Sequence, residues 1–124
     1  TVGFIRNLPH TFVEAFKATL EEVTTADFLI LVADASSPAI ERHLDAVNEV
    51  LEEIGAAGKP RITVFNKIDL LNEATRSSVR LLARAYEPSV CVSVATGEGI
   101  PELLRKISDV VRDHHLLAVP AGDA

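Results

Sequence analysis

Two patterns of apolar and polar residues alternate along the chain. A continuous apolar run at residues 28–33 stops at Asp34 and predicts a parallel strand that is covered on both faces. Two further strands are predicted at residues 61–65 and 89–94. Elsewhere, apolar residues recur every three or four positions, which predicts helices over about residues 12–23, 38–54, 73–86 and 100–111. Helix and strand therefore alternate from one end of the chain to the other.

Local signals mark where two of these helices begin. Thr11 and Glu14 have the spacing of a capping box. Ser37 is expected to be the N-cap of the second helix, with Pro38 in its first turn. The alternation is typical of an α/β fold with a parallel sheet and right-handed crossovers. We expect a single domain over residues 1–124, with ligands bound outside the carboxyl ends of the strands.

Charge and composition narrow the possible partners. The 124 residues carry a formal net charge of −6, which disfavours non-specific attraction to DNA or to anionic membranes. No apolar stretch approaches the roughly 20 residues of a membrane-spanning helix. The single cysteine, Cys91, lies between Val90 and Val92 and is expected to be a buried, reduced thiol. These features together predict a cytoplasmic protein.

A polar motif, Asn66-Lys67-Ile68-Asp69, directly follows the second predicted strand. A carboxylate in this place can accept hydrogen bonds from both the ring N–H and the exocyclic amine of guanine, whereas adenine would leave it unpaired. A second loop, residues 93–99, follows the third strand, so both loops can meet the same ligand. The alternative interpretation is a polar loop in which Asp69 is the N-cap of the next helix.

Together the two loops resemble those of the carboxyl-terminal half of a translation-factor-type GTPase domain of the P-loop class. The resemblance covers nearly the whole chain and implies part of a three-layer, Rossmann-like fold with parallel strands. It also implies that Asp69 reads the guanine edge, that Asn66 holds the base and ties neighbouring loops, and that the Lys67 stem lies against the ring. Ile68 completes this motif. The guanine carbonyl oxygen would be received by the backbone N–H groups of Ser93, Val94 and Ala95.

The opening of the chain makes the resemblance more specific. Thr1, Val2 and Gly3 resemble the remainder of an Asp-x-x-Gly motif, in which the glycine N–H meets the γ-phosphate. The aspartate of that motif, which supports magnesium through water, would precede Thr1. Residues 1–22, together with residues 34–38 and 46–51, closely resemble the HflX family of ribosome-associated GTPases.

This resemblance implies a GTPase that uses GTP or GDP and Mg²⁺ and acts on the large ribosomal subunit of stalled or stressed ribosomes. The sequence contains no Gly-x-x-x-x-Gly-Lys-[Ser/Thr] motif. We therefore expect the P-loop half of the domain and the magnesium ligands to lie upstream. Because phosphoryl transfer depends on those groups, this chain by itself is expected to recognise guanine weakly and to be inactive in hydrolysis. Self-association through its first strand is also expected.

Two other functions fit the same sequence. The first is a non-catalytic α/β interaction module with vestigial nucleotide motifs. The second is a different doubly wound nucleotide or flavin binder. Competition between guanine and adenine nucleotides would expose the latter, whereas a folded chain that binds neither nucleotide would favour the module.

Overall fold

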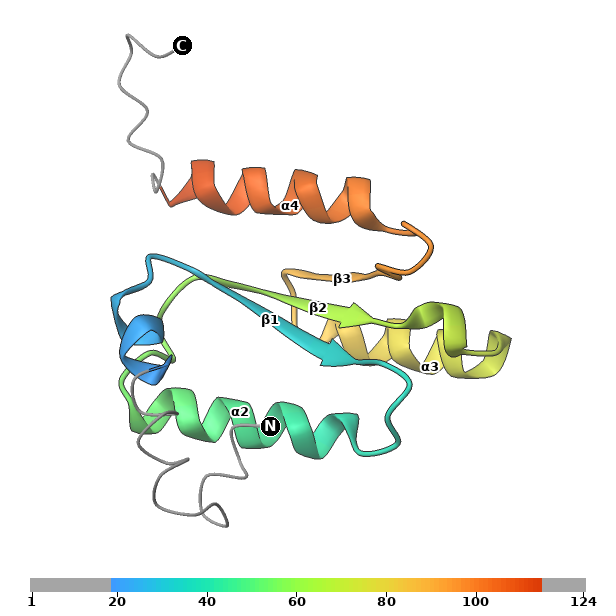
Figure 1. The fold of residues 1–124 in the computed structure, drawn as a ribbon, viewed down its shortest axis with the longest axis horizontal. Coiled ribbons are helices and arrows are strands. Elements are labelled where there is room, and N and C mark those ends of the chain that lie inside the picture. The colour runs from blue at the N-terminus through green and yellow to red at the C-terminus, as the bar shows by residue number, and fades with distance from the viewer. Residues whose placement is uncertain (1–18, 115–124) are drawn as a thin grey trace, which may run out of the picture.

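The computed structural model describes residues 19–114, and within them one parallel sheet separates two layers of helices. The strands follow the order β1-β2-β3, with α2 and α3 on one face and α4 on the other (Figure 1). The predicted α/β class with parallel strands is therefore confirmed. The elements are β1 (Leu29–Asp34), α2 (Ile40–Glu53), β2 (Arg61–Asn66), the 3-10 helix η2 (Ile68–Leu70), α3 (Glu73–Arg84), β3 (Ser89–Cys91) and α4 (Ile100–Asp113).

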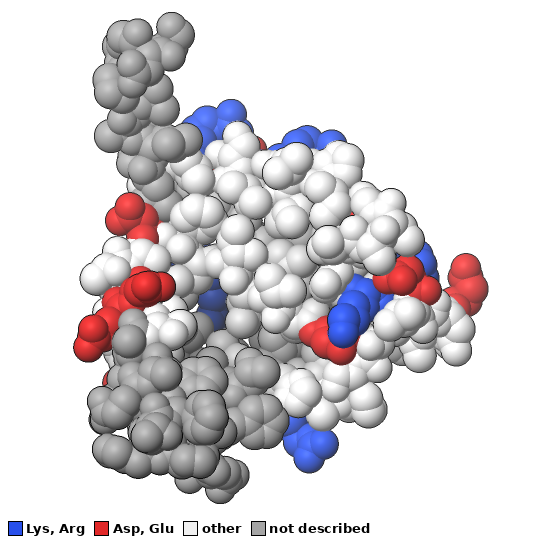
Figure 2. Space-filling view, viewed as in Figure 1, with Lys and Arg blue, Asp and Glu red and all other residues white. Residues whose placement is uncertain are grey.

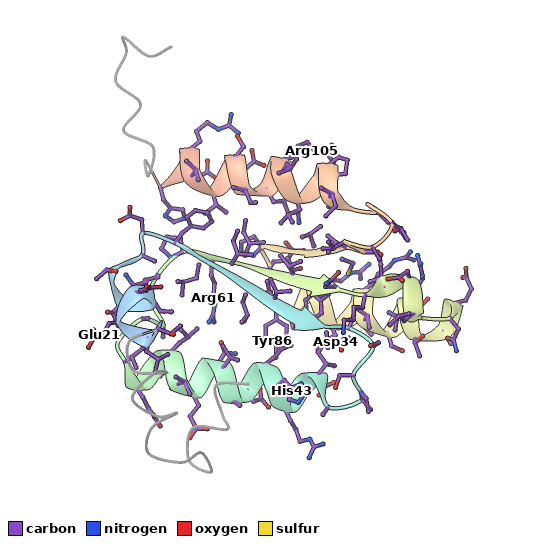
Figure 3. All side chains as sticks on the ribbon, in the orientation of Figure 1. Glu21, Asp34, His43, Arg61, Tyr86 and Arg105 are labelled. Atoms are coloured by element: carbon purple, nitrogen blue, oxygen red, sulfur yellow. The ribbon has the colours of Figure 1, made fainter. Side chains whose placement is uncertain are left out.

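The central strand β2 holds the two halves of the core together. Phe65 is fully buried on the side of α2 and α3, where it meets Leu44 of α2 and Val79 of α3. The Tyr86 ring packs against Phe65 edge to face, with centroids 6.2 Å apart, and Figure 3 shows Tyr86 between the sheet and α2. The opposite side of β2 contributes Ile62 and Val64 to a second cluster under α4. Both faces of β2 are thus covered, as expected for a central parallel strand.

The first strand departs from its prediction, because helices cover only one of its faces in the part of the chain that the structure describes. Leu31 and Ala33 pack into the cluster beneath α2 and α3. Ile30 and Val32 face the opposite way and are 45% and 60% exposed. Figure 2 shows the resulting uncharged surface over β1, with charged side chains around its rim. The prediction that this strand is covered on both faces is wrong for residues 19–114.

Several element ends also differ from the predictions. Helix α2 begins at Ile40, and its cap position, Ala39, makes no side-chain cap. Ser37 instead forms a turn: its N–H donates to Asp34 O (3.2 Å) and its Oγ accepts from Ala39 N–H (3.2 Å). Helix α3 ends at Arg84 and not at residue 86. Residues 19–25 are helical, so the first predicted helix continues two residues further, and its start lies outside the described residues.

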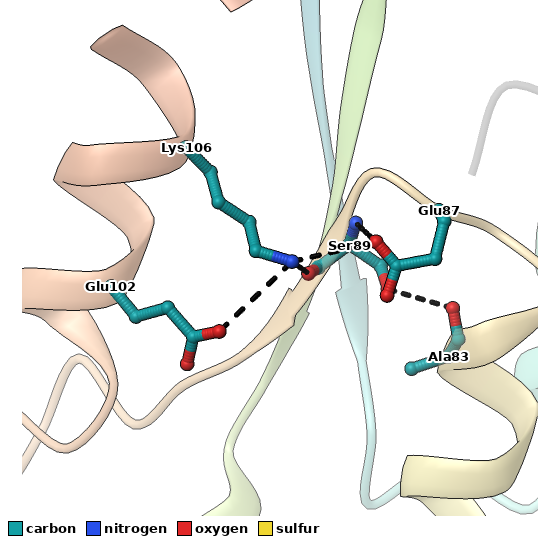
Figure 4. A network of polar contacts seen from close by, with 5 residues as sticks. All are labelled: Ala83, Glu87, Ser89, Glu102 and Lys106. Carbon is teal, nitrogen blue, oxygen red and sulfur yellow. Dashed lines mark hydrogen bonds and ion pairs between the residues drawn. The ribbon is translucent and has the colours of Figure 1, made fainter. Parts of the chain in front are cut away.

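The outer edge of β3 is closed by side chains. Ser89 N–H donates to Glu87 Oε2 (3.2 Å), and Ser89 O accepts from Lys106 Nζ (2.6 Å). Ser89 Oγ also donates to Ala83 O of α3 (2.7 Å), as Figure 4 shows. An unpaired strand edge is a template for pairing with another chain. Here Glu87, just before β3, and Lys106 of α4 bond the outward-facing main-chain groups of Ser89.

Candidate functional site

The carboxyl end of β2 carries the first half of the candidate site. Asn66 is the last residue of the strand, and Lys67 then adopts a left-handed conformation with φ of 69°. This conformation is uncommon for a residue with a Cβ. It turns the chain into η2, where Ile68 is buried and its N–H donates to Val92 O (3.2 Å). The turn thereby presents Asp69 towards the loop that follows β3.

That loop provides the second half of the site, and three hydrogen bonds define its shape. Gly97 N–H donates to Ser93 O (2.7 Å), Ser93 N–H to Glu98 O (2.9 Å), and Thr96 N–H to Ser93 Oγ (3.1 Å). Ser93 is fully buried. β3 was predicted to extend to residue 94 but ends at Cys91. Val92 N–H still donates to Phe65 O (2.8 Å), but β2 ends at Asn66, and Val92 O accepts instead from Ile68 N–H in the turn (3.2 Å). The loop is a closed turn built around the Ser93 side chain.

Two hydrogen bonds join the halves of the site across 24 and 28 residues of sequence. Ser93 Oγ donates to Asp69 Oδ1 (2.8 Å), and Val94 N–H donates to Asn66 Oδ1 (3.1 Å). The sequence predicted that these two loops would meet one ligand, and the structure brings them together. It does so through Asn66 and Asp69, two of the three polar residues of the motif that were expected to contact the base. Asp69 itself is exposed and is not the N-cap of α3, since Asn72 Oδ1 accepts from Thr75 N–H there (2.9 Å).

The backbone donors expected in the second loop are not equivalent. Ser93 and Val94 both direct their N–H groups to acceptors within the protein. Ala95 is exposed, and its N–H makes no hydrogen bond to the described residues. In this conformation Ala95 therefore offers the free donor of the three. Thr1, Val2 and Gly3, the remaining predicted site residues, lie outside the described residues.

Two charged pairs at the same end of the sheet were not predicted from the sequence. Asp34 closes β1, in register with Asn66, and its Oδ2 lies 3.3 Å from Lys67 Nζ. Arg76 of α3 contacts both oxygens of Glu98, with Nη1–Oε2 at 3.0 Å and Nη2–Oε1 at 3.3 Å. The hydroxyl of Ser36, then its N–H and the Lys67 ammonium, hold the pKa of Asp34 below its ordinary value of 3.8. Asp34 is thus ionised at neutral pH.

The remaining chemistry of the described residues is limited. Cys91 was predicted to be a buried thiol, but it is a free thiol that is only partly buried. Its partial burial raises its pKa above the ordinary value. No group of three or more His, Cys, Asp or Glu residues between residues 19 and 114 could hold a metal ion. None of the helices in that range is long and apolar enough to cross a membrane. The site that stands out among the described residues is therefore the pair of joined loops, which carries a carboxylate and a free backbone donor.

Comparison with known proteins identifies relatives that match most of the chain. No protein-family profile matches it. Curated proteins named GTPase HflX match it with 54% identity over 84% of the chain in Akkermansia muciniphila, 42% over 90% in Treponema denticola and 42% over 97% in Escherichia coli. The chain spans 24%, 28% and 29% of the length of these three relatives. Over nearly all of its residues, the chain belongs to the HflX family of GTPases and matches a carboxyl-terminal part of the family's GTPase domain.

Proposed function

We propose that this chain is the guanine-recognising part of an HflX-type GTPase. One observation carries the proposal: the motif at the end of β2 and the loop after β3 are joined by the Ser93–Asp69 and Val94–Asn66 hydrogen bonds. These bonds place a carboxylate and a free backbone N–H at one end of the sheet, where open α/β sheets bind ligands. The relatives at 42–54% identity all bear the name GTPase.

The arrangement suits guanine for a chemical reason. Guanine carries two adjacent donors, the ring N–H and the exocyclic amine, beside a carbonyl acceptor. The Asp69 carboxylate would accept from the two donors, and the Ala95 N–H would donate to the carbonyl. Val94 N–H could join it only by releasing Asn66 Oδ1. Adenine reverses the donor and acceptor at this edge, so the same site would leave aligned polar groups unpaired.

Phosphate binding, Mg²⁺ binding and ribosome binding are proposed for the whole protein and not for this chain alone. We infer that groups outside this sequence bind the phosphates and Mg²⁺, which would neutralise charge during phosphoryl transfer. Thr1, Val2 and Gly3 would then contribute the end of the γ-phosphate motif. We also propose that the whole protein binds the large ribosomal subunit of stalled or stressed ribosomes in the cytoplasm, which co-sedimentation of the full-length protein with 50S subunits would test.

Calorimetric titration with GDP, and with ADP as the control nucleotide, tests base recognition by this chain directly. We expect weak binding of GDP and none of ADP, because the site formed by the two loops contacts the base and not the phosphates. A ¹⁵N-labelled chain should show the Ala95 amide resonance shifting with GDP. Absence of heat and of any shift, from a chain shown to be folded by circular dichroism, would refute the proposal and favour a non-catalytic interaction module.

A change of one atom in Asp69 provides a sharper test. Asp69→Asn retains an oxygen that can accept from Ser93 Oγ but replaces one acceptor with a donor. The variant should therefore lose GDP binding. It should gain the ability to bind xanthosine diphosphate, whose base carries a carbonyl in place of the guanine amine. A variant that bound neither GDP nor xanthosine diphosphate would show that Asp69 acts on loop structure and not on the base.

A further inference from the structure

Asp34 uses its two carboxylate oxygens for different contacts. Oδ1 accepts from Ser36 N–H (2.9 Å) and from Ser36 Oγ (2.6 Å). Oδ2 accepts from Lys67 Nζ (3.3 Å). Ser36 follows β1 by two residues, so the first pair of bonds fixes the carboxylate against its own turn. The second oxygen is then aimed across the strand ends, and Figure 3 shows Asp34 at the carboxyl end of β1.

The contact with Asp34 restricts the conformations of the Lys67 side chain. Its long side chain starts from a left-handed residue at the end of β2 and reaches back to the end of β1. Free in solution, such a side chain would populate many rotamers, and ordering it opposes binding. The contact with Asp34 draws the Lys67 stem back over the paired ends of β1 and β2. The stem is thereby held beside Asn66, which is paired in register with Asp34.

We propose that Asp34 is a positioning residue for the nucleotide, which holds the Lys67 stem as a preformed surface for the purine ring. This role rests on the proposed function, the recognition of guanine by the Asn66–Asp69 motif. Stability does not explain the pair, because the two side chains are 38% and 52% exposed, and exposed pairs of this kind contribute little to folding. Preorganisation of a binding surface does explain it, since a stem already held in place costs less to order when the base arrives.

The variant Asp34→Asn isolates this contact. An Asn side-chain oxygen can still accept both hydrogen bonds from Ser36, whereas its amide nitrogen cannot accept from the Lys67 ammonium. We expect GDP affinity to fall by about two- to tenfold, the range for ordering one long side chain. The urea unfolding midpoint should stay close to that of the wild type. Asp27→Asn, an exposed carboxylate before the amino end of the same strand, is the matched control and should leave both quantities unchanged.

A double-mutant cycle shows whether Asp34 acts through Lys67. In a Lys67→Ala background, Asp34→Asn should have no further effect on GDP affinity. In the absence of nucleotide, Asp34→Asn should also increase the mobility of the Lys67 ε-methylene, measured by ¹³C relaxation on a lysine-labelled chain. The mobility of Lys59, whose Nζ donates to Ala26 O (2.6 Å), should not change.

The outcomes separate this inference from the proposed function. If the wild-type chain binds GDP and Asp34→Asn binds it equally well, the positioning role is overturned and base recognition stands. An equal loss on Asp34→Asn in the Lys67→Ala background would also overturn it, because Asp34 would then act without the lysine. If the wild-type chain binds no guanine nucleotide at all, both the proposed guanine recognition and the positioning role of Asp34 are refuted.

Discussion

Gly99 lies where a side chain has no room. A Cβ built on it would come within 2.3 Å of Cys91 O and 3.1 Å of Val92 Cγ1, and its φ is +79°. Gly99→Ala would therefore combine a left-handed alanine with a clash against the end of β3. We expect the free energy of unfolding to fall by about 2–5 kcal/mol in urea denaturation.

A nearby glycine separates the two causes. Gly97 has a φ of +87°, but a Cβ added to it would have no atom within 4 Å. Gly97→Ala should therefore lower the free energy of unfolding by only the cost of a left-handed alanine, about 1–2 kcal/mol. If the two variants lost the same unfolding free energy, the clash at Gly99 would contribute nothing and backbone strain would explain the whole effect.

At the scale of elements, one pair connects helix α3 to the loop after β3. Arg76 lies in the first half of α3, its side chain is 25% exposed, and it contacts both oxygens of Glu98. Glu98 O is also the acceptor for Ser93 N–H. The pair thus holds the residue that closes the loop.

Removing this pair should loosen the loop more than the fold. For Arg76→Gln we expect faster amide hydrogen exchange at Ser93 and Gly97, and a loss of no more than about 1 kcal/mol in unfolding free energy. Arg112→Gln, which removes an ion pair with Asp109 within α4, is the control. Exchange at Ser93 that matches the wild type in the Arg76 variant would show that the backbone bonds alone fix the loop.

The elements that were predicted well are those whose signal is local. Apolar runs and hydrophobic periodicity located all three strands and the helices between them. The rule that ligands lie at strand ends predicted that Asn66, Asp69 and the Ser93 loop would meet, and they do. Boundaries were less accurate. At Ser37 a turn competed with the cap, and beyond Val92 the β3 ladder has no partner because β2 turns away at Lys67.

The charged pairs could not be found in the same way. Lys67 and Asp34 are 33 residues apart, and Arg76 and Glu98 are 22 apart. Whether such residues meet depends on the register of the strands and on the rotamers of long side chains, neither of which leaves a periodic trace in the sequence. The roles that the family resemblance assigned to Thr1, Val2 and Gly3 stay predictions, because those residues lie outside the described range.

Across the whole molecule, the two edges of the sheet differ. Glu87 and Lys106 close the edge at β3. At the other edge, Leu29 N–H donates to Pro60 O and Ala35 N–H to Asn66 O. The alternation of a parallel ladder then turns the main-chain groups of residues 30 and 32 away from β2. Within the described residues, β1 is therefore the more open of the two edges.

Because of this asymmetry, we expect the 124-residue chain to self-associate through β1. Ile30 and Val32 are exposed beside the open edge, so pairing of two β1 strands would bury apolar surface and satisfy main-chain groups at once. In analytical ultracentrifugation we expect the wild-type chain to form dimers or larger species as its concentration rises. Val32→Lys should shift it to monomer, because a charge would be buried in the paired sheet.

An equally exposed apolar residue elsewhere tests whether the effect belongs to β1. Leu81 on α3 is 67% exposed, against 60% for Val32. Leu81→Lys removes a comparable apolar side chain and adds the same charge, yet it leaves the edge of β1 untouched, so it should associate as the wild type does. If both variants became monomeric, general surface hydrophobicity would explain the association. If the wild type stayed monomeric at high concentration, the open edge would not act as a pairing site in this chain.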